Sequence, residues 1–294
     1  WKAALGGYRW QHDYSREPFM TGGVSASTEC ADIDNDGHLD LLTGEIVHPD
    51  IGPAADPATL LINTGEAEVT LTRQDQDLIG LGRPFLGAGR DEGVMNNTVL
   101  DFDNDGWLDV YWSASGYPMN EGLLYHQDAP LQFSQVTFEE GFRHYHSHGV
   151  QPVDLDRDGD LDLVVGALDS YCGPDWGGNP CWDPPTTRIY ENLVGHRQNW
   201  IQLTLEGGPT TNRAAIGARV SVTAGGVTQT QEVDGGHGRY TTQRDLTLHF
   251  GLGAACEAAV TVRWPNSTLT EQQLTVGAGY RYLVVEGQAP VAVE

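Results

Sequence analysis

The sequence predicts an all-β protein in which blades of a partial β-propeller, residues 1–195, precede a β-sandwich, residues 196–294. Two observations support this prediction. A nine-residue acidic loop between short apolar segments occurs three times before residue 196, and alternating apolar and polar segments separated by glycines fill the remainder. No segment has the periodicity of a long amphipathic helix.

The acidic loops share the pattern Asp-x-Asp-x-Asp-Gly-x-Leu-Asp at residues 32–40, 101–109 and 154–162. Carboxylates at loop positions 1, 3, 5 and 9 would repel one another without a cation, and Ca²⁺ prefers about six to eight oxygen ligands. Glycine at position 6 permits a positive φ, and we expect position 7 to offer its carbonyl oxygen. The sequence thus predicts three calcium ions, with these ligands: Asp32, Asp34, Asp36, His38, Asp40, Asp101, Asp103, Asp105, Trp107, Asp109, Asp154, Asp156, Asp158, Asp160 and Asp162.

An EF-hand is excluded as the source of these loops. It requires a glutamate at position 12, where this chain has Thr43, Trp112 and Val165. The residues after each loop are apolar and rich in β-branched side chains, which predicts strands in place of the flanking helices.

The composition is strongly acidic, with 16 basic and 41 acidic residues and a formal net charge of −25. This charge disfavours a nucleic-acid partner or an anionic membrane surface. No apolar run is long enough to span a membrane. Few lysines, together with the calcium loops, predict an exported protein, whether extracellular, on the cell surface or periplasmic.

The four cysteines also fit an oxidising compartment. Cys172 and Cys181 enclose a Gly- and Pro-rich segment without periodic pattern, and we predict a disulfide between them. Cys30 and Cys256 could form a second bridge or remain as two buried thiols, and the second alternative is favoured.

Each acidic loop is expected to join the first and second strands of a unit of four strands, and four strands form one propeller blade. Propellers typically close with about four to eight blades. Three units predict an unclosed ring, so either an upstream segment completes it, or strands near residues 1–25 or 180–195 contact another polypeptide. A four-bladed ring completed by residues 1–18 is the main alternative.

The loops resemble FG-GAP or VCBS repeats, and residues 192–286 resemble the ASPIC/UnbV domain of the cartilage acidic protein-like family. The second resemblance rests on residues 212–220, 248–253 and 262–265. It implies a calcium-binding propeller joined to a β-sandwich in an exported protein. Relatives usually carry more repeats than this chain.

Variable inserts lie at the blade ends opposite the acidic loops and form our candidate binding face, because binding residues usually lie on loops of a rigid scaffold. Packing over apolar edges is an equally weighted alternative. His144, His146 and His148 could converge on a transition metal. Histidines that are solvated or hydrogen-bonded are, however, the favoured interpretation. The face comprises His48, Tyr117, His144, His146, His148, Tyr171, Trp176 and Trp182.

These features favour an exported, calcium-binding, non-catalytic protein that binds protein or glycan through its propeller loops. One alternative is an accessory subunit of a larger extracytoplasmic complex. Another is a hydrolase or lyase that acts on polysaccharide at the insert face. The sequence contains no nucleophile elbow, phosphate-binding loop or haem-attachment motif.

Overall fold

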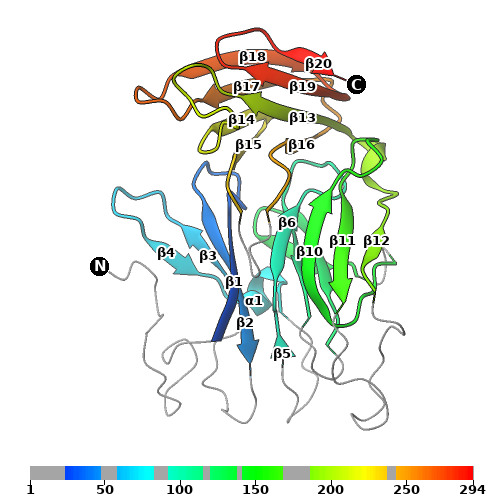
Figure 1. The fold of residues 1–294 in the computed structure, drawn as a ribbon. Coiled ribbons are helices and arrows are strands. Elements are labelled where there is room, and N and C mark those ends of the chain that lie inside the picture. Colours follow the sequence, from blue (N-terminus) through cyan, green and yellow to red (C-terminus); the bar gives the residue numbers. More distant parts are fainter. Residues whose placement is uncertain are drawn as a thin grey trace.

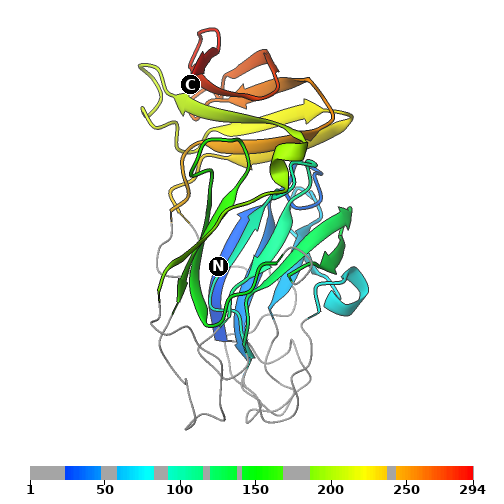
Figure 2. The same cartoon turned by 90° about the vertical axis from the view of Figure 1, so that its right-hand side faces the viewer.

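The structure is a computed structural model that describes residues 24–47, 58–82, 92–114, 120–137, 141–167, 186–236 and 243–293. Three sheets stand side by side, and two further sheets lie across one end of them (Figures 1 and 2). The predicted all-β fold is confirmed. Within the described residues, no helix is long and apolar enough to cross a membrane.

The three side-by-side sheets follow the order of the chain. The first contains β1 (Val24–Ala31), β2 (Asp40–Val47), β3 (Thr59–Asn63) and β4 (Leu71–Arg73), with β5 (Glu92–Gly93) beside β2. The second contains β6 (Asn97–Leu100), β7 (Asp109–Trp112), β8 (Leu123–Ala129) and β9 (Gln132–Gln135). The third contains β10 (Ser147–Val153), β11 (Asp162–Ala167) and β12 (Arg188–Tyr190). A short helix α1 (Gln76–Ile79) follows β4, with Asp75 as its N-cap.

Each acidic loop joins the first and second strands of its sheet, as the sequence analysis assumed. The first strands are neighbours, because β1 and β10 both contact β6. The described part of the chain shows no closed ring. The expectation of four strands per unit is wrong for the third sheet as described, because after β12 the chain enters the 3₁₀ helix η3 (Gly195–Arg197) and then the C-terminal sheets.

The second sheet is buried on both faces. Every residue of β6 and β7 is buried, since the sheet lies between two neighbours. Side chains alternate across a strand, so Trp112 packs toward the first sheet and Tyr111 toward the third. Two separate apolar clusters therefore hold the three sheets together.

The C-terminal region is a sandwich of two four-stranded sheets. One has the order β16 (Leu248–Gly253), β13 (Asn199–Glu206), β19 (Tyr280–Val285), β20 (Val291–Val293), and the other β15 (Val227–Glu232), β14 (Arg219–Ala224), β17 (Glu257–Arg263), β18 (Glu271–Gly277). Alternating strands between glycine turns predict an antiparallel sandwich, but β13 and β19 pair in parallel. Parallel pairing requires a long connection, and the chain between these two strands supplies it by forming strands of the other sheet. One apolar cluster, which includes Phe250 and Trp264, fills the space between the sheets.

Candidate metal-binding loops

The three acidic loops fold in the same way. The first-position carboxylate accepts a hydrogen bond from the N–H of the sixth-position glycine, at 3.0, 2.8 and 3.1 Å in the first, second and third loops. Those glycines, Gly37, Gly106 and Gly159, have φ of 88°, 94° and 95°. The predicted positive φ is therefore confirmed, and a Cβ would be disfavoured there.

The ninth-position carboxylate joins each loop to the third strand of its sheet or, in the third sheet, to the segment directly after that strand. One oxygen of Asp40 accepts the N–H of Ile33 at 2.9 Å, and the other accepts the N–H of Asn63 at 2.8 Å. The second and third loops repeat both contacts, with Asp109 and Asp162 as acceptors. The sequence analysis named these aspartates only as metal ligands. The structure gives them a role in bracing the loop as well.

Carboxylates converge in every loop. In each loop, three carboxylates offer oxygens within 4.8 Å of one another: Asp32, Asp34 and Asp36; Asp101, Asp103 and Asp109; Asp154, Asp156 and Asp158. Asp32 Oδ1 and Asp154 Oδ1 are buried and have no hydrogen-bond partner. Buried carboxylate oxygens without a donor are costly unless a cation neutralises them. These clusters could thus hold a metal ion.

Burial raises the pKa values of several aspartates in the acidic loops. Desolvation raises the pKa of Asp32 to about 6 and that of Asp40 to about 7. The pKa values of Asp101 and Asp109 lie well above the ordinary range for the same reason. Burial with the neighbouring Asp158 charge raises the pKa of Asp160 to about 7. A bound cation would oppose all of these shifts.

The fourth loop position, which the sequence analysis passed over, connects one loop to the next. Asn35 Nδ2 donates to the carbonyl oxygen of Gly106 at 3.1 Å, and Asn104 Nδ2 donates to that of Gly159 at 3.1 Å. Arg219 donates to the carbonyl oxygen of Gly37. The recurrence of asparagine at position 4 of two loops was the signal that could have revealed this connection.

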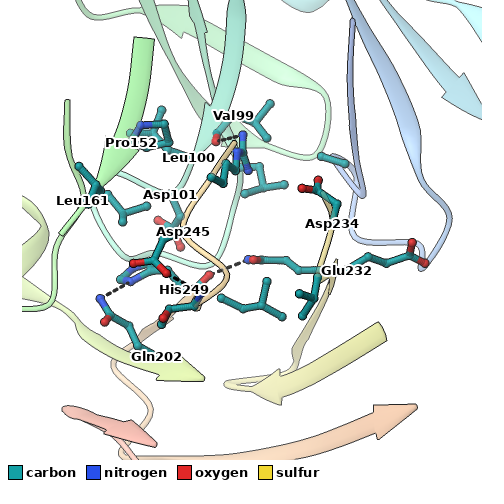
Figure 3. Close-up of a pocket in the computed structure, with 18 of the residues that line it drawn as sticks. Val99, Leu100, Asp101, Pro152, Leu161, Gln202, Glu232, Asp234, Asp245 and His249 are labelled. Carbon is teal, nitrogen blue, oxygen red and sulfur yellow. Dashed lines mark hydrogen bonds between the residues drawn. The ribbon is translucent and has the colours of Figure 1, made fainter. Parts of the chain in front are cut away.

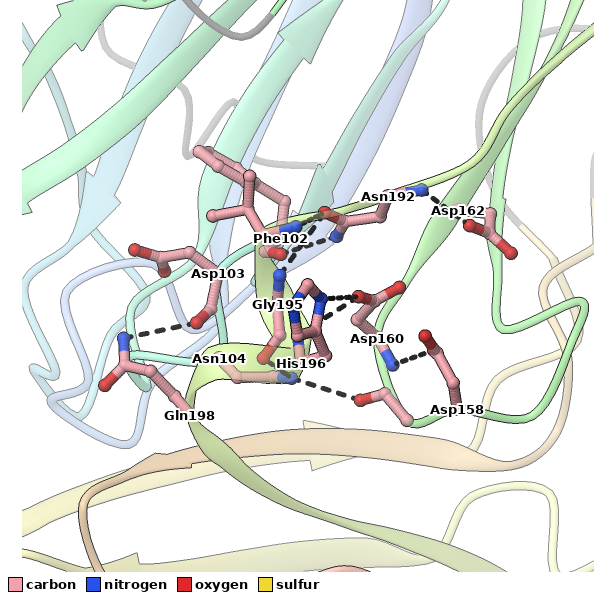
Figure 4. Close-up of polar contacts among 12 residues, drawn as sticks. Phe102, Asp103, Asn104, Asp158, Asp160, Asp162, Asn192, Gly195, His196 and Gln198 are labelled. Atoms are coloured by element: carbon pink, nitrogen blue, oxygen red, sulfur yellow. Dashed lines mark hydrogen bonds and ion pairs between the residues drawn. The ribbon is translucent and has the colours of Figure 1, made fainter.

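Asn104 is also held by the C-terminal region and by η3. Its Oδ1 lies 2.6 Å from His249 Nε2, and its Nδ2 also donates to Gly195 O at 3.0 Å (Figure 4 shows Asn104 beside Gly195). Burial lowers the pKa of His249 to about 4, so the imidazole is neutral and its Nε2–H donates to Asn104. Gln202 lies 3.3 Å from His249 Nδ1 on the other side of the ring.

The sandwich covers the loops closely. A Cβ on Gly251 would lie 2.1 Å from Asp101 Oδ2, and one on Gly159 would lie 1.7 Å from the Trp200 ring. Arg281 donates to Asp154 Oδ2 at 2.7 Å. A cavity of about 400 Å³ remains between the loops and the sandwich, with Asp101, Gln202, Glu232 and His249 among its lining residues (Figure 3).

His126, which the sequence analysis did not single out, lies beside the second loop. Its Nε2 is 3.4 Å from Asp103 Oδ2 and 3.7 Å from Asp105 Oδ2, and its Nδ1 is 2.8 Å from Asp128 Oδ1. The neighbouring carboxylates of Asp103 and Asp105 raise the pKa of His126 to about 11. No local sequence pattern identifies this residue, because the contact depends on strand register.

Only part of the candidate binding face lies within the described residues. His144 and His146 are buried, and His148 is half-buried. The three histidines do not form one of the potential metal-ligand groups among the described residues. His146 has a φ of 54°, so the segment is not continuously extended, as it would have to be for residues two apart to point the same way. The other members, His48, Tyr117, Tyr171, Trp176 and Trp182, lie outside the described residues.

Of the four cysteines, two lie within the described residues and two lie outside them. Cys172 and Cys181 lie outside the described residues. Cys30 and Cys256 are free and exposed, so the favoured expectation of two buried thiols is wrong. The alternation along β1 explains Cys30, since Ser27 and Glu29 point inward while Thr28 and Cys30 face outward.

Comparison with known families confirms the predicted resemblance. The model of the FG-GAP-like repeat matches residues 101–165, which contain the second and third acidic loops. The model named ASPIC and UnbV matches residues 208–291, which contain most of the sandwich.

Three similar proteins are named cartilage acidic protein 1. Those of Homo sapiens, Xenopus tropicalis and Mus musculus are each 24% identical to this chain, over 193, 192 and 190 residues. The alignments cover 63%, 61% and 62% of this chain and 27%, 26% and 27% of those proteins. This chain therefore matches only about a quarter of the length of these relatives.

Proposed function

We propose that this chain is an exported, calcium-binding, non-catalytic scaffold, in which calcium fixes the acidic loops against the C-terminal sandwich. The observation that carries this proposal is the buried, unpartnered Oδ1 of Asp32 and of Asp154, each within a cluster of three carboxylates. Calcium would supply the partner that these two oxygens lack, while Arg281 already pairs with the other oxygen of Asp154.

The proposed ligands are the residues that the loop pattern predicts. They comprise the carboxylates at positions 1, 3, 5 and 9 and the carbonyl oxygens of His38, Trp107 and Asp160. Each ninth-position oxygen accepts one backbone hydrogen bond and keeps a second lone pair for a cation.

The division into residues 1–195 and 196–294 is part of this proposal. It is supported by the apolar clusters, because the two in the first region draw only on residues 31–194 and the one in the second only on residues 201–284. The two regions meet at the acidic loops. A loop that lost its ion would therefore lose its fixed contact with the sandwich.

The location and ligand class follow from this role. Extracellular calcium modules bind with Kd of about 10⁻⁴–10⁻³ M, which suits partly exposed loops such as the first and third. We propose that the insert ends of the blades, opposite the calcium loops, contact a protein or a glycan outside the cytoplasm.

Calcium titration tests the proposal. Titration calorimetry of chelator-treated protein with calcium should give three calcium sites per chain. It should give two if another ion already occupies the second loop. Asp32→Asn should remove one site, and Asp245→Asn, which lines the cavity outside the loops, should remove none. Failure to bind calcium at millimolar concentration would contradict the proposal.

A second candidate role is that of an accessory subunit in a larger complex. It is favoured by β12, whose residue Ile189 is 65% exposed at the outer edge of the third sheet, followed by Leu193 at 63%. Exposed apolar side chains on and directly after an edge strand favour contact with another chain. Native mass spectrometry of the particle from its source organism distinguishes a monomer from such an assembly.

A further inference from the structure

The second loop has a neighbour that the other two lack. The N–H that the ninth-position carboxylate accepts comes from the third strand in the first two sheets and from the segment directly after β12 in the third sheet. The preceding residue occupies an equivalent register position in each sheet. These equivalent residues are Ile62, His126 and Glu191. Among the described residues, only the second sheet has an imidazole at this register position.

The separations around this imidazole match those of metal ligands. His126, Asp103 and Asp105 each offer a ligand atom, all within 4.8 Å. Ligands about 2.1 Å from a tetrahedral zinc ion lie about 3.4 Å from one another. His126 Nε2 is 3.4 and 3.7 Å from the two carboxylate oxygens, longer than the usual N–H···O distance of about 2.9 Å.

The opposite side of the ring is held as metal-bound histidines usually are. Asp128 Oδ1 lies 2.8 Å from His126 Nδ1, which orients the ring and directs Nε2 toward the two carboxylates. Phe102 packs edge-on against the imidazole, with 5.7 Å between ring centres. About a fifth of each of the three ligand side chains is exposed, so an ion can enter from solvent.

The first-position carboxylate of the second loop also differs from its counterparts. Asp101 Oδ1 accepts the N–H of Asp105 at 3.0 Å, whereas Asp32 Oδ1 and Asp154 Oδ1 have no hydrogen-bond partner. Asp101 Oδ1 therefore has one backbone donor that its counterparts in the first and third loops lack, although it keeps a second lone pair. The second loop thus offers two overlapping groups of ligand atoms, one of Asp101, Asp103 and Asp109 and one of Asp103, Asp105 and His126.

We propose that the second loop is a site for a divalent transition metal ion of the zinc class, bound by His126 Nε2, Asp103 and Asp105 and oriented by Asp128. Imidazole nitrogen suits zinc, whereas calcium prefers oxygen ligands. Because Asp103 and Asp105 are shared, zinc and calcium compete there. The first and third loops remain calcium sites, and the zinc site does not depend on their occupancy.

Zinc titration of the chelator-treated, full-length chain in excess calcium tests this assignment. We expect one zinc ion per chain, and anomalous diffraction at the zinc edge should place it beside His126. His126→Ile, which installs the residue of the first sheet, should abolish binding. Asp128→Asn keeps the imidazole and should weaken zinc binding about 10- to 100-fold.

His196 provides the matched control. Its Nδ1 is 3.9 Å from Asp160 of the third loop, but it has no second carboxylate partner among the described residues. His196→Ile should leave zinc affinity unchanged. Equal loss in the His196 and His126 variants would overturn the assignment, because it would indicate nonspecific histidine binding.

The outcomes separate this inference from the proposed function. Calcium binding at all three loops with no zinc bound would overturn the inference alone, and His126 would then serve as a cation that neutralises Asp103 and Asp105. Zinc bound at His126 without calcium at the first and third loops would support the inference and overturn the proposed function. If His126→Ile fails to fold, unaltered zinc affinity in Asp128→Asn would still overturn the inference.

Discussion

The side-by-side sheets and the C-terminal sandwich are stabilised in different ways. The first region divides its apolar side chains between two clusters and buries carboxylates such as Asp40, Asp101 and Asp109. The sandwich has one continuous apolar cluster of 18 buried residues, which contains no carboxylate. The comparison teaches that the first region needs positive charge to compensate its buried carboxylates. The sandwich buries apolar and neutral polar side chains and does not need such compensation.

Three arginines join the two regions. Arg219 contacts the first loop, Arg281 contacts the third loop, and Arg244 pairs with the buried Glu29 of β1. Arg244 also donates to Thr98 Oγ1 at 2.8 Å, at the contact between the first two sheets. The sandwich therefore contributes positive charge to the region that carries the acidic loops.

Chelation should produce the largest difference between the regions. When the free calcium concentration is 100 times the Kd, one bound ion stabilises a fold by about 2.7 kcal/mol. Three ions would therefore contribute on the order of 8 kcal/mol. With chelator, we expect the melting transition of residues 24–190 to fall while that of the sandwich changes little. Calorimetry with hydrogen exchange measures this, and equal loss of protection in β1 and β17 would contradict the separation.

Substitution of one buried tryptophan in each region should act on that region alone. Trp264 and Trp112 are both almost completely buried, and truncation to alanine costs about 3–5 kcal/mol. Trp264→Ala should lower only the calcium-insensitive transition, and Trp112→Ala only the calcium-sensitive one. Urea unfolding with and without calcium measures both. A shift of both transitions by either variant would indicate one cooperative unit.

The pH dependence of stability should change sign when calcium is bound. Without metal, burial raises the pKa of Asp40 from 3.8 to about 7 and that of Asp32 to about 6. The folded state then binds more protons than the unfolded state between about pH 4 and 7, so the free energy of unfolding rises as pH falls, by a few kcal/mol at most.

Calcium-loaded protein should behave in the opposite way. The ion lowers these pKa values, so the free energy of unfolding falls as the carboxylates are protonated and calcium leaves. Denaturant unfolding at several pH values, with calcium and with chelator, measures both slopes. Parallel slopes would show that calcium does not contact these aspartates.

Substitution of the asparagines at the fourth loop position should lower the free energy of unfolding by a smaller amount, which differs between the two loops. Asn104→Ala removes the buried hydrogen bonds to Gly159 O, Gly195 O and His249 Nε2 and should cost about 1–3 kcal/mol. Asn35→Ala removes one part-buried bond and should cost less. Thermal unfolding compares the variants, and equal costs would contradict the greater role of the second loop.

The sequence alone determined the local features of this protein. The loop spacing predicted the turns with positive φ at Gly37, Gly106 and Gly159, and alternation predicted the sandwich strands. These predictions succeeded because turn geometry and strand alternation depend on residues close together in the chain.

Only the tertiary structure decided which groups meet at the loops. His249 and Asn104 are 145 residues apart, Arg281 and Asp154 are 127 apart, and the contacts of His126 depend on the pairing of β7 with β8. The parallel pairing of β13 with β19 was likewise absent from the sequence pattern. A local pattern records which face of a strand is apolar, but not which distant strand or loop will cover it, because that choice is made by packing of the whole chain.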